Sequence, residues 1–205
     1  MASEKPEAAP GSERLVFRFM KPGDEDRLQR MFQTCADYFQ NVAGSGGPDA
    51  QAGAREIHAA GELKGRKVAL ITLREGGQPI GAAGWWAGNP KPDRALMGML
   101  MIAPRYRKQG YGREAIAALE KYLAPEGIIA IRTAFQRSRT MVVPMVRALG
   151  FREMSVREHT ELGAAGAGIS LWEKKFGKEQ APPAAEGQAE APADAPQEQP
   201  AAAQE

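Results

Sequence analysis

The sequence predicts an α+β fold: a central, twisted, mixed and mostly antiparallel sheet of about six to seven strands, flanked by helices. Short apolar runs of strand length recur along the chain, and turns rich in glycine and proline separate them. Two longer segments instead repeat their apolar residues at helical spacing. The strands come as hairpins and as strand–helix pairs, and this order favours a layered sheet with helices packed against it.

Composition divides the chain into one folded domain and two tails. Residues 177–205 consist largely of Ala, Pro, Glu and Gln and carry no large apolar side chain, so burial cannot offset their chain entropy. Residues 1–12 have the same character. We therefore expect a disordered N-terminal tail over 1–12, a folded domain over 13–176 and a disordered tail over 177–205.

The charge of the folded part limits its partners. The chain holds 27 basic and 25 acidic residues, but the tails hold two of the former and eight of the latter, which leaves about +8 on residues 13–176. This charge suits a small polyanionic ligand. No Lys/Arg-rich run with interleaved aromatic residues predicts nucleic-acid binding. No apolar run approaches the roughly 18 residues of a membrane span, so no membrane partner is expected.

The ends of the sequence and its single cysteine bear on location. The first residues lack the apolar core of a secretory signal. Cys35 cannot form an internal disulfide, which fits a reducing compartment. We expect a cytoplasmic protein, either a monomer or a homodimer, without a metal site.

The first third of the chain predicts a strand, a helix and an irregular segment. Residues 15–20 alternate around two phenylalanines, as in a strand. Asp24 is a good N-cap for a helix whose apolar face runs through Cys35. Residues 41–64 are rich in glycine and alanine, so we expect mostly loop there, with a short helix near residues 54–60.

A hairpin and the central strand follow. Residues 68–73 form a nearly continuous apolar run, residues 75–78 have turn composition, and residues 79–86 return as the next strand. The apolar run 97–102 predicts a buried strand at the sheet centre, which Pro104 ends.

The second half alternates strands and helices. Beyond the glycines at 110 and 112, an apolar stripe predicts a helix up to Leu123. Residues 127–133 predict a fifth strand. A short helix follows over 140–149, with Pro144 near its start and Gly150 as its C-terminal stop. Residues 151–160 and 168–176 are expected to form a last hairpin.

The turn between the central strand and the next helix is suited to binding phosphate. Arg105, Arg107 and Lys108 precede Gly110 and Gly112. The first N–H groups of a helix have no partner within the helix, and the helix dipole adds positive charge there. Glycines let the backbone approach an anion closely. We expect Gly110 and Gly112 to face a pyrophosphate, with Arg107 anchoring either the loop or the anion.

Two other interpretations of these glycines remain. Gly110-x-Gly112-x-x-Ala115 satisfies a loose dinucleotide fingerprint, which would make the protein a nucleotide-binding oxidoreductase. However, a polar stretch separates the strand from Gly110, and residues 129–131 offer no acidic group for a ribose. The glycines could also mark a helix start that binds nothing.

The motif Arg107-x-x-Gly110-x-Gly112, after a strand that ends in Pro-x-Tyr-Arg, resembles motif A of the GNAT superfamily of N-acetyltransferases. Residues 146–151, Val-Arg-Ala-Leu-Gly-Phe, resemble that family's closing helix and turn. The resemblance implies that the chain binds acetyl-CoA and transfers its acetyl group to a primary amine. The implied donor-binding residues are Leu100, Met101, Ile102, Arg107, Lys108, Gln109, Gly110, Tyr111, Gly112, Arg113 and Arg139.

Two positions depart from the family's pattern. Val146 stands where many members have a tyrosine that protonates the leaving thiolate, and Arg139 stands where an asparagine is frequent. An altered mechanism, or a non-catalytic acyl-CoA-binding sensor, is therefore an alternative to the acetyltransferase.

Catalysis also requires a base for the attacking ammonium and groups that hold the acceptor. Candidates for the base are Asp37, Glu56 and His58, with Asp37 favoured because aromatic residues follow it. Tyr38 is expected to contact the acceptor. Trp85 and Trp86 must point to opposite faces of their strand, so one belongs to the core and the other lines the acceptor site; we assign the latter role to Trp85.

Overall fold

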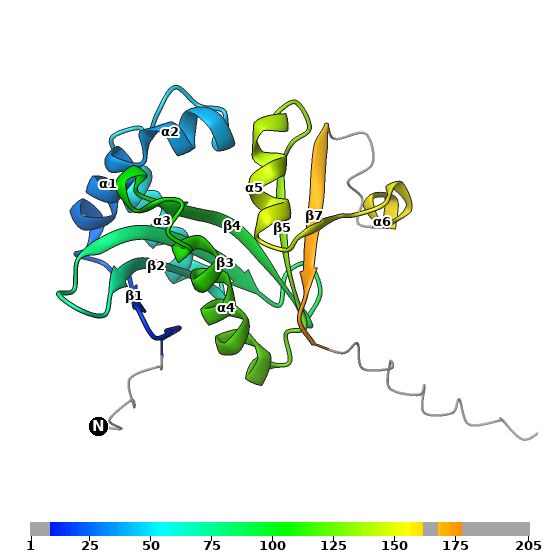
Figure 1. The fold of residues 1–205 in the computed structure, drawn as a ribbon, viewed down its shortest axis with the longest axis horizontal. Helices are drawn as coiled ribbons and strands as arrows, with labels where there is room; N and C mark the ends of the chain where they lie inside the picture. Colours follow the sequence, from blue (N-terminus) through cyan, green and yellow to red (C-terminus); the bar gives the residue numbers. More distant parts are fainter. Residues whose placement is uncertain (1–8, 162–167, 178–205) are drawn as a thin grey trace, which may run out of the picture.

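The chain folds around a seven-stranded sheet, in a computed structural model that describes residues 9–161 and 168–177 (Figure 1). The described strands are β1 (Leu15–Phe19), β2 (Arg66–Leu73), β3 (Pro79–Ala87), β4 (Arg94–Ile102), β5 (Ala130–Gln136), β6 (Arg152–Glu153) and β7 (Ile169–Lys175). Their order in the sheet is β1-β2-β3-β4-β5-β7-β6. Among the described strands, β4 and β5 form the one parallel pair. The predicted mixed, mostly antiparallel sheet is confirmed.

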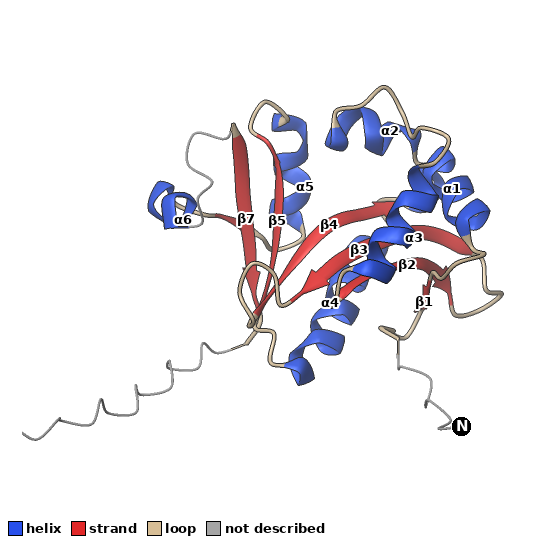
Figure 2. Ribbon diagram, turned by 180° about the vertical axis from the view of Figure 1, so that it is seen from behind, coloured by secondary structure: helices blue, strands red, loops and turns tan. Residues whose placement is uncertain are grey.

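Helices cover both faces of this sheet. They are α1 (Glu25–Thr34), α2 (Ala36–Tyr38), α3 (Ala52–Glu62), α4 (Tyr111–Leu123), α5 (Val143–Ala148) and α6 (Val156–Glu161). A π-helical turn, η1 (Phe39–Ala43), continues α2, and single 3-10 turns lie at η2 (Pro104–Tyr106), η3 (Ala124–Glu126) and η4 (Thr140–Val142). Helices α1 and α3 lie on the face seen in Figure 2, whereas α4 and α5 cover the opposite face.

Each face has its own apolar core. Ile116 and Leu119 of α4 pack with Val146 of α5 against one side of the sheet. Leu28 and Phe32 of α1 pack against the other side. The amphipathic stripes that predicted these helices are the faces that the helices bury, and burying one Leu or Phe side chain contributes about 1.5–3 kcal/mol.

Strand β4 contains a β-bulge at Gly98. The pairing with β3 passes from Met99 opposite Gly84 directly to Met97 opposite Trp85, so Gly98 has no partner there. The burial of the methionine side chains agrees with this shift in register. Met97 belongs to the core under α4, but Met99 belongs to the core under α1. In a regular strand both would share one face, so the bulge reverses the alternation in the middle of β4.

The parallel pair β4–β5 is short. Its pairing covers Arg94 to Leu96 on β4 and Ala130 to Arg132 on β5. Beyond these residues the two strands diverge, as Figure 1 shows above the crossing point. From Met97 onward, one edge of β4 therefore has no neighbour among the described strands.

A buried carboxylate joins the strands where they diverge. Glu173 of β7 is 1% exposed, and its Oε2 lies 2.8 Å from Nε of Arg132 and 3.4 Å from Nε of Arg94. Its Oε1 accepts a hydrogen bond from Arg152 at 3.2 Å. Arg94 and Arg132 are themselves buried. Glu173 thus connects the first residue of β4, the last paired residue of β5 and β6.

Two sequence-based assignments need correction. The predicted strand over residues 151–160 is only β6, after which the chain forms α6. The reason is a capping box: Glu158 accepts from the Ser155 N–H at 2.6 Å, and Ser155 Oγ accepts from the Glu158 N–H at 3.3 Å. His159 then fixes α6 to β7 because its Nε2 accepts from the Leu171 N–H at 3.0 Å.

The second correction concerns the start of the domain. Residues 9–12, assigned to the tail, belong to the fold. The Pro10 carbonyl accepts from the Phe17 N–H at 3.0 Å, and Ser12 Oγ donates to Glu114 at 2.6 Å. The remainder of the predicted tails, residues 1–8 and 178–205, lies outside the described residues.

Replacing the buried carboxylate should destabilise the fold. Glu173→Gln removes the counter-charge that the buried guanidinium groups of Arg94 and Arg132 share, and breaking one side of a buried ion pair costs about 3–5 kcal/mol. Urea unfolding measures this loss. Glu158→Gln is the matched control, because it removes the charge of a partly exposed partner of Arg152 and keeps a side chain that can cap α6, so it should cost less than about 1 kcal/mol. Equal losses in the two variants would contradict the role assigned to Glu173.

Candidate active site

The loop between β4 and α4 presents main-chain donors to solvent. Gly110 is the N-cap of α4 with φ of 86°, and Lys108 adopts φ of 60°. Positive φ at a residue other than glycine is unusual and often marks a functional loop. Among the described residues, no side chain caps the first turn of α4. The loop therefore offers free N–H groups, the positive end of a 13-residue helix and the Lys108 ammonium to an anion.

Arg107 holds the loop in place. Its Nε donates to the Ile102 carbonyl at 2.7 Å, and its guanidinium forms a bidentate ion pair with Asp37, in which Nη2 lies 3.0 Å from Oδ1. This ion pair joins the loop to α2. The hydrogen bond from Arg107 lowers the pKa of Asp37. The carboxylate that we favoured as a base is therefore already engaged, and its geometry is that of a residue that positions Arg107.

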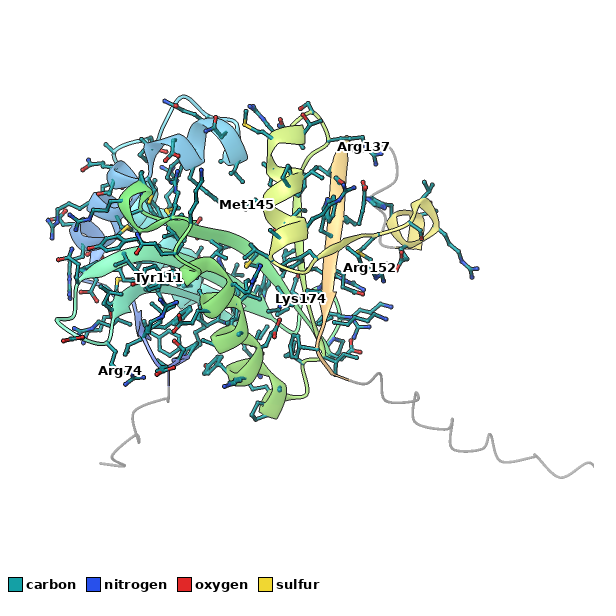
Figure 3. All side chains as sticks on the ribbon, viewed as in Figure 1. Arg74, Tyr111, Arg137, Met145, Arg152 and Lys174 are labelled. Carbon is teal, nitrogen blue, oxygen red and sulfur yellow. The ribbon has the colours of Figure 1, made fainter. Side chains whose placement is uncertain are left out.

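Arg14 is a further cation at the loop, and the sequence did not reveal it. Its Nη2 lies 3.4 Å from the Gln109 carbonyl, and its guanidinium carbon lies 4.4 Å from the centre of the Tyr111 ring. Glu114 fixes it through a hydrogen bond of 2.7 Å from Nε. Figure 3 labels Tyr111 at the start of α4. No local pattern links Arg14 to a loop about a hundred residues away.

The divergence of β4 and β5 opens a cavity of ≈ 120 Å³. Its lining combines the exposed edge of β4 with α2, β5 and α5, and includes Tyr38, Gly98, Leu100, Phe135, Val146 and Leu149. Met145 of α5, labelled in Figure 3, also lines it. The lining is largely apolar, so the cavity suits a slender chain with few charges.

Main-chain groups of alternate residues point into this cavity. Ala103 donates to Ile80 of β3, so in an antiparallel ladder Met101 also directs its main-chain groups to β3. Leu100 and Ile102 direct theirs the other way, toward the side that β5 has left. Of the three β4 residues expected to bind the donor through their main chain, Leu100 lines the cavity, Ile102 points to the same side with its carbonyl bound to Arg107, and Met101 points away.

Tyr38 contacts the β4 edge at the bulge. Its hydroxyl lies 3.4 Å from the Gly98 carbonyl. Burial raises the pKa of Tyr38 to about 12, the negative charge of Glu56 adds to the shift, and a hydrogen bond with the Leu100 main chain opposes it. The hydroxyl is therefore protonated throughout the neutral pH range and can donate a hydrogen bond or a proton.

A second cavity, also of ≈ 120 Å³, lies on the α3 side of β4. Glu56, Arg66, Trp86 and Leu96 line it together with Gly98 and Met99. Glu56 pairs with Arg66 at 2.8 Å, and Trp86 Nε1 donates to the Lys64 carbonyl at 3.0 Å. Gly98 and Met99 line both cavities, so the two meet at the bulge of β4.

The two tryptophans differ in burial. Trp85 is 2% exposed and packs against Phe17, Phe19 and Tyr122 in the core under α4. Trp86 is partly exposed. Both residues line the second cavity, so the expected contact of Trp85 with the acceptor stays a prediction, and Trp86 is a further candidate for it.

The other candidates are spread around the site. Gln109 closes its own turn by donating to the Arg105 carbonyl at 2.9 Å, and Arg113 donates to the Ala148 carbonyl of α5 at 3.3 Å. Arg139 donates to the Gln40 carbonyl at 3.3 Å and so contacts η1 rather than the loop. His58 is exposed and pairs with Glu62.

Two negative findings concern the described part of the chain. Residues 9–161 and 168–177 contain no cluster of His, Cys, Asp and Glu side chains that could hold a metal ion. Within the same ranges, no helix combines the length and the apolar character needed to cross a membrane.

Comparison with known proteins identifies relatives by sequence model and by structure. The model of the GNAT acetyltransferase family matches residues 28–151. An acetyltransferase from Thermus thermophilus has a similar structure, with a TM-score of 0.64 and 21% identity over 80% of this chain and 97% of that chain. No match was found among curated proteins.

Two similar structures contain coenzyme A. One is a ribosomal-protein α-N-acetyltransferase, with a TM-score of 0.62 and 14% identity over 82% of this chain and 97% of that chain. The other is an aminoglycoside acetyltransferase, with a TM-score of 0.59 and 14% identity over 78% of this chain and 94% of that chain. At these identities the structural likeness concerns the fold.

The ion pair between Asp37 and Arg107 should make a pH-dependent contribution to stability. Because the folded protein lowers the pKa of Asp37, the contribution is present above the unfolded value of about 3.9 and is lost as the pH falls through the lower folded value. Both side chains are more than a third exposed, so we expect less than about 1 kcal/mol. The free energies of urea unfolding of the unmodified chain and of Asp37→Asn should therefore differ at pH 7, and the difference should shrink as the pH falls below about 3.9. A difference that does not change with pH would assign the effect to something other than this carboxylate's charge.

Proposed function

Because the chain belongs to the GNAT acetyltransferase family, we propose that this acyltransferase moves the acetyl group of acetyl-CoA to a primary amine by direct attack of the amine on the thioester. The observation that carries the proposal is the divergence of β4 and β5, which opens a slender cavity beside the glycine loop. The two are adjacent, since a Cβ added at Gly112 would lie 3.6 Å from Leu149, which lines the cavity. The enzyme would act in the cytoplasm as a monomer or homodimer.

The loop and the β4 edge together fit coenzyme A. A pyrophosphate would be held by the N–H groups of the first turn of α4, by Lys108 and by the cationic side chains around it, with Arg107 keeping the loop in place. The Leu100 carbonyl and the Ile102 N–H would bind the amide groups of the pantetheine arm. The complexes of two structural relatives with coenzyme A support this assignment.

Two groups of the chain can assist the departure of the thiolate. The Leu100 N–H faces the cavity and would stabilise negative charge on the thioester oxygen, an effect typically worth about 100- to 1,000-fold in rate. The electron pair of the C–S bond leaves with sulfur as the new C–N bond forms. Tyr38 is protonated and lines the same cavity as the apolar Val146, so we assign to Tyr38 the proton that sulfur takes up.

Glu56 is the better candidate for the base. It lines the second cavity, where an amine can approach Gly98, and its charge acts on Tyr38. Both carboxylates are ion-paired, Asp37 with Arg107 and Glu56 with Arg66, but of the two only Glu56 lines the second cavity. Glu56 would accept the proton of the ammonium, directly or through one water molecule, and so free the nitrogen lone pair for attack.

The glycine loop provides the first test. Gly110→Val forces a β-branched residue into φ of 86° and moves the N–H groups away from the anion, at a cost of about 1–3 kcal/mol. Calorimetric titration should show that the unmodified chain binds acetyl-CoA. The Kd of the variant should be at least about tenfold higher. Gly76→Val is the matched control, because Gly76 has φ of 75° in the turn between β2 and β3 with no heavy atom within 4 Å of an added Cβ. It should leave the affinity unchanged. Absence of binding by the unmodified chain would refute the proposal.

The two carboxylates can be separated by kinetics. Glu56→Gln should lower kcat/KM for the amine by about 100-fold or more, because general base catalysis contributes roughly 10²–10⁴. The Kd of acetyl-CoA should stay the same. Asp37→Asn should instead weaken acetyl-CoA binding and leave the turnover of the saturated enzyme nearly intact. The reverse pattern would restore Asp37 as the base.

A further inference from the structure

The bulge residue Gly98 stands between two cavities that otherwise lie on opposite sides of β4. One cavity follows the β4–β5 divergence and contains Tyr38 and Leu100. The other lies under α3 and contains Glu56 and Trp86. Any group that passes from one cavity to the other must pass Gly98 and Met99, the two residues that line both.

Neither backbone conformation nor packing requires a glycine at this position. Gly98 is not among the residues with positive φ, so an ordinary residue could adopt its conformation. A Cβ built on Gly98 would have no heavy atom within 4 Å. By contrast, a Cβ on Gly81 of β3 would lie 2.2 Å from the Met101 carbonyl oxygen, so Gly81 is needed for close packing. The empty volume at Gly98 is therefore the junction of the cavities.

The chemistry of the second cavity favours an ammonium group on a narrow chain. Glu56 supplies a carboxylate, one oxygen of which pairs with Arg66 at 2.8 Å, and Trp86 supplies an aromatic ring of the kind that attracts cations. Leu96 and Met99 supply an apolar wall for methylene groups. The volume of ≈ 120 Å³ corresponds to about four water molecules, at about 30 Å³ each. So small a volume favours a single methylene chain over a ring or a branched carbon next to the nitrogen.

We propose that Gly98 is the aperture through which the acceptor nitrogen reaches the thioester, and that it restricts acceptors to amino groups carried at the end of an unbranched methylene chain. This inference rests on the proposed acetyl transfer. The bulk of such an acceptor stays outside the cavity under α3. Amino groups on a branched carbon, such as α-amino groups of amino acids, would be poor acceptors, because the small cavity leaves less room beside the nitrogen.

Two isomeric amines test the aperture on the unmodified enzyme. With acetyl-CoA as donor, thiol release should give a kcat/KM for 1-aminobutane that exceeds that for 2-aminobutane by about 10- to 200-fold, the usual effect of one misplaced methyl group. Equal values for the two isomers would overturn the inference. This comparison needs no variant and does not depend on the folding of one.

A substitution then places a methyl group in the junction. Gly98→Ala should lower kcat/KM for 1-aminobutane at least about tenfold. Gly61→Ala is the matched control, since Gly61 is exposed on α3, lines neither cavity, and has no heavy atom within 4 Å of an added Cβ. It should change kcat/KM less than about threefold. Similar losses in both variants, or no loss in Gly98→Ala, would overturn the inference.

Calorimetry with acetyl-CoA separates this inference from the function on which it rests. If the unmodified chain binds acetyl-CoA and acetylates both isomers equally well, only the aperture is wrong. If it binds no acetyl-CoA and acetylates neither isomer, the acetyl transfer itself is wrong. If Gly98→Ala loses acetyl-CoA binding as strongly as turnover, Gly98 belongs to the donor cavity and the aperture is again rejected.

Discussion

From Met97 onward, the edge of β4 that would pair with β5 has none of the described strands beside it, and its polar groups must find other partners. Tyr38 contacts the carbonyl of Gly98, and Arg107 donates to that of Ile102. Between them the main chain of Leu100 faces the cavity. The elements that supply these partners, α2 and the glycine loop, are in turn joined by the ion pair of Asp37 with Arg107. The site is thus assembled around backbone that the sheet leaves unpaired.

The point from which β4 and β5 diverge is fixed by a buried ion pair. Glu173 binds Arg94 and Arg132 at the end where β4 and β5 are still paired, and Arg152 brings β6 to the same point. Charged groups at this depth hold one geometry, because any rearrangement would leave a buried charge without its partner. The strands are held firmly where they meet, so the width of the cavity farther along follows from their twist.

The sequence predicted what depends on local patterns. The buried strand, the glycine loop and the stripe of α4 each follow from a few adjacent residues, and all three formed as expected. The capping box of Ser155 and Glu158 was also local, and it would have predicted α6 had it been weighed against the strand pattern. Arg14 was not predictable in this way, because the register of β1 brings it to Tyr111.

Adjacent residues also make different contacts in the fold, which their spacing in the sequence does not determine. Asp37 and Tyr38 are consecutive, yet one holds Arg107 and the other faces Gly98. Trp85 and Trp86 were correctly expected on opposite faces, but which face is buried depends on the helices that cover the sheet. Sequence patterns identified the candidate residues, and long-range packing determines which contacts each of them makes.

The bulge at Gly98 also bears on how β4 can vary. It inserts one residue between Met97 and Met99, so these two side chains serve different cores although they are two positions apart. Deleting Gly98 would make Met97 and Met99 adjacent in a regular strand and would leave both on their present faces. Inserting or deleting a residue elsewhere in β4 would instead move every later side chain to the opposite face. Over evolutionary time the strand can therefore enlarge or lose residue 98 without rearranging either core, whereas the rest of the strand can vary only by substitution.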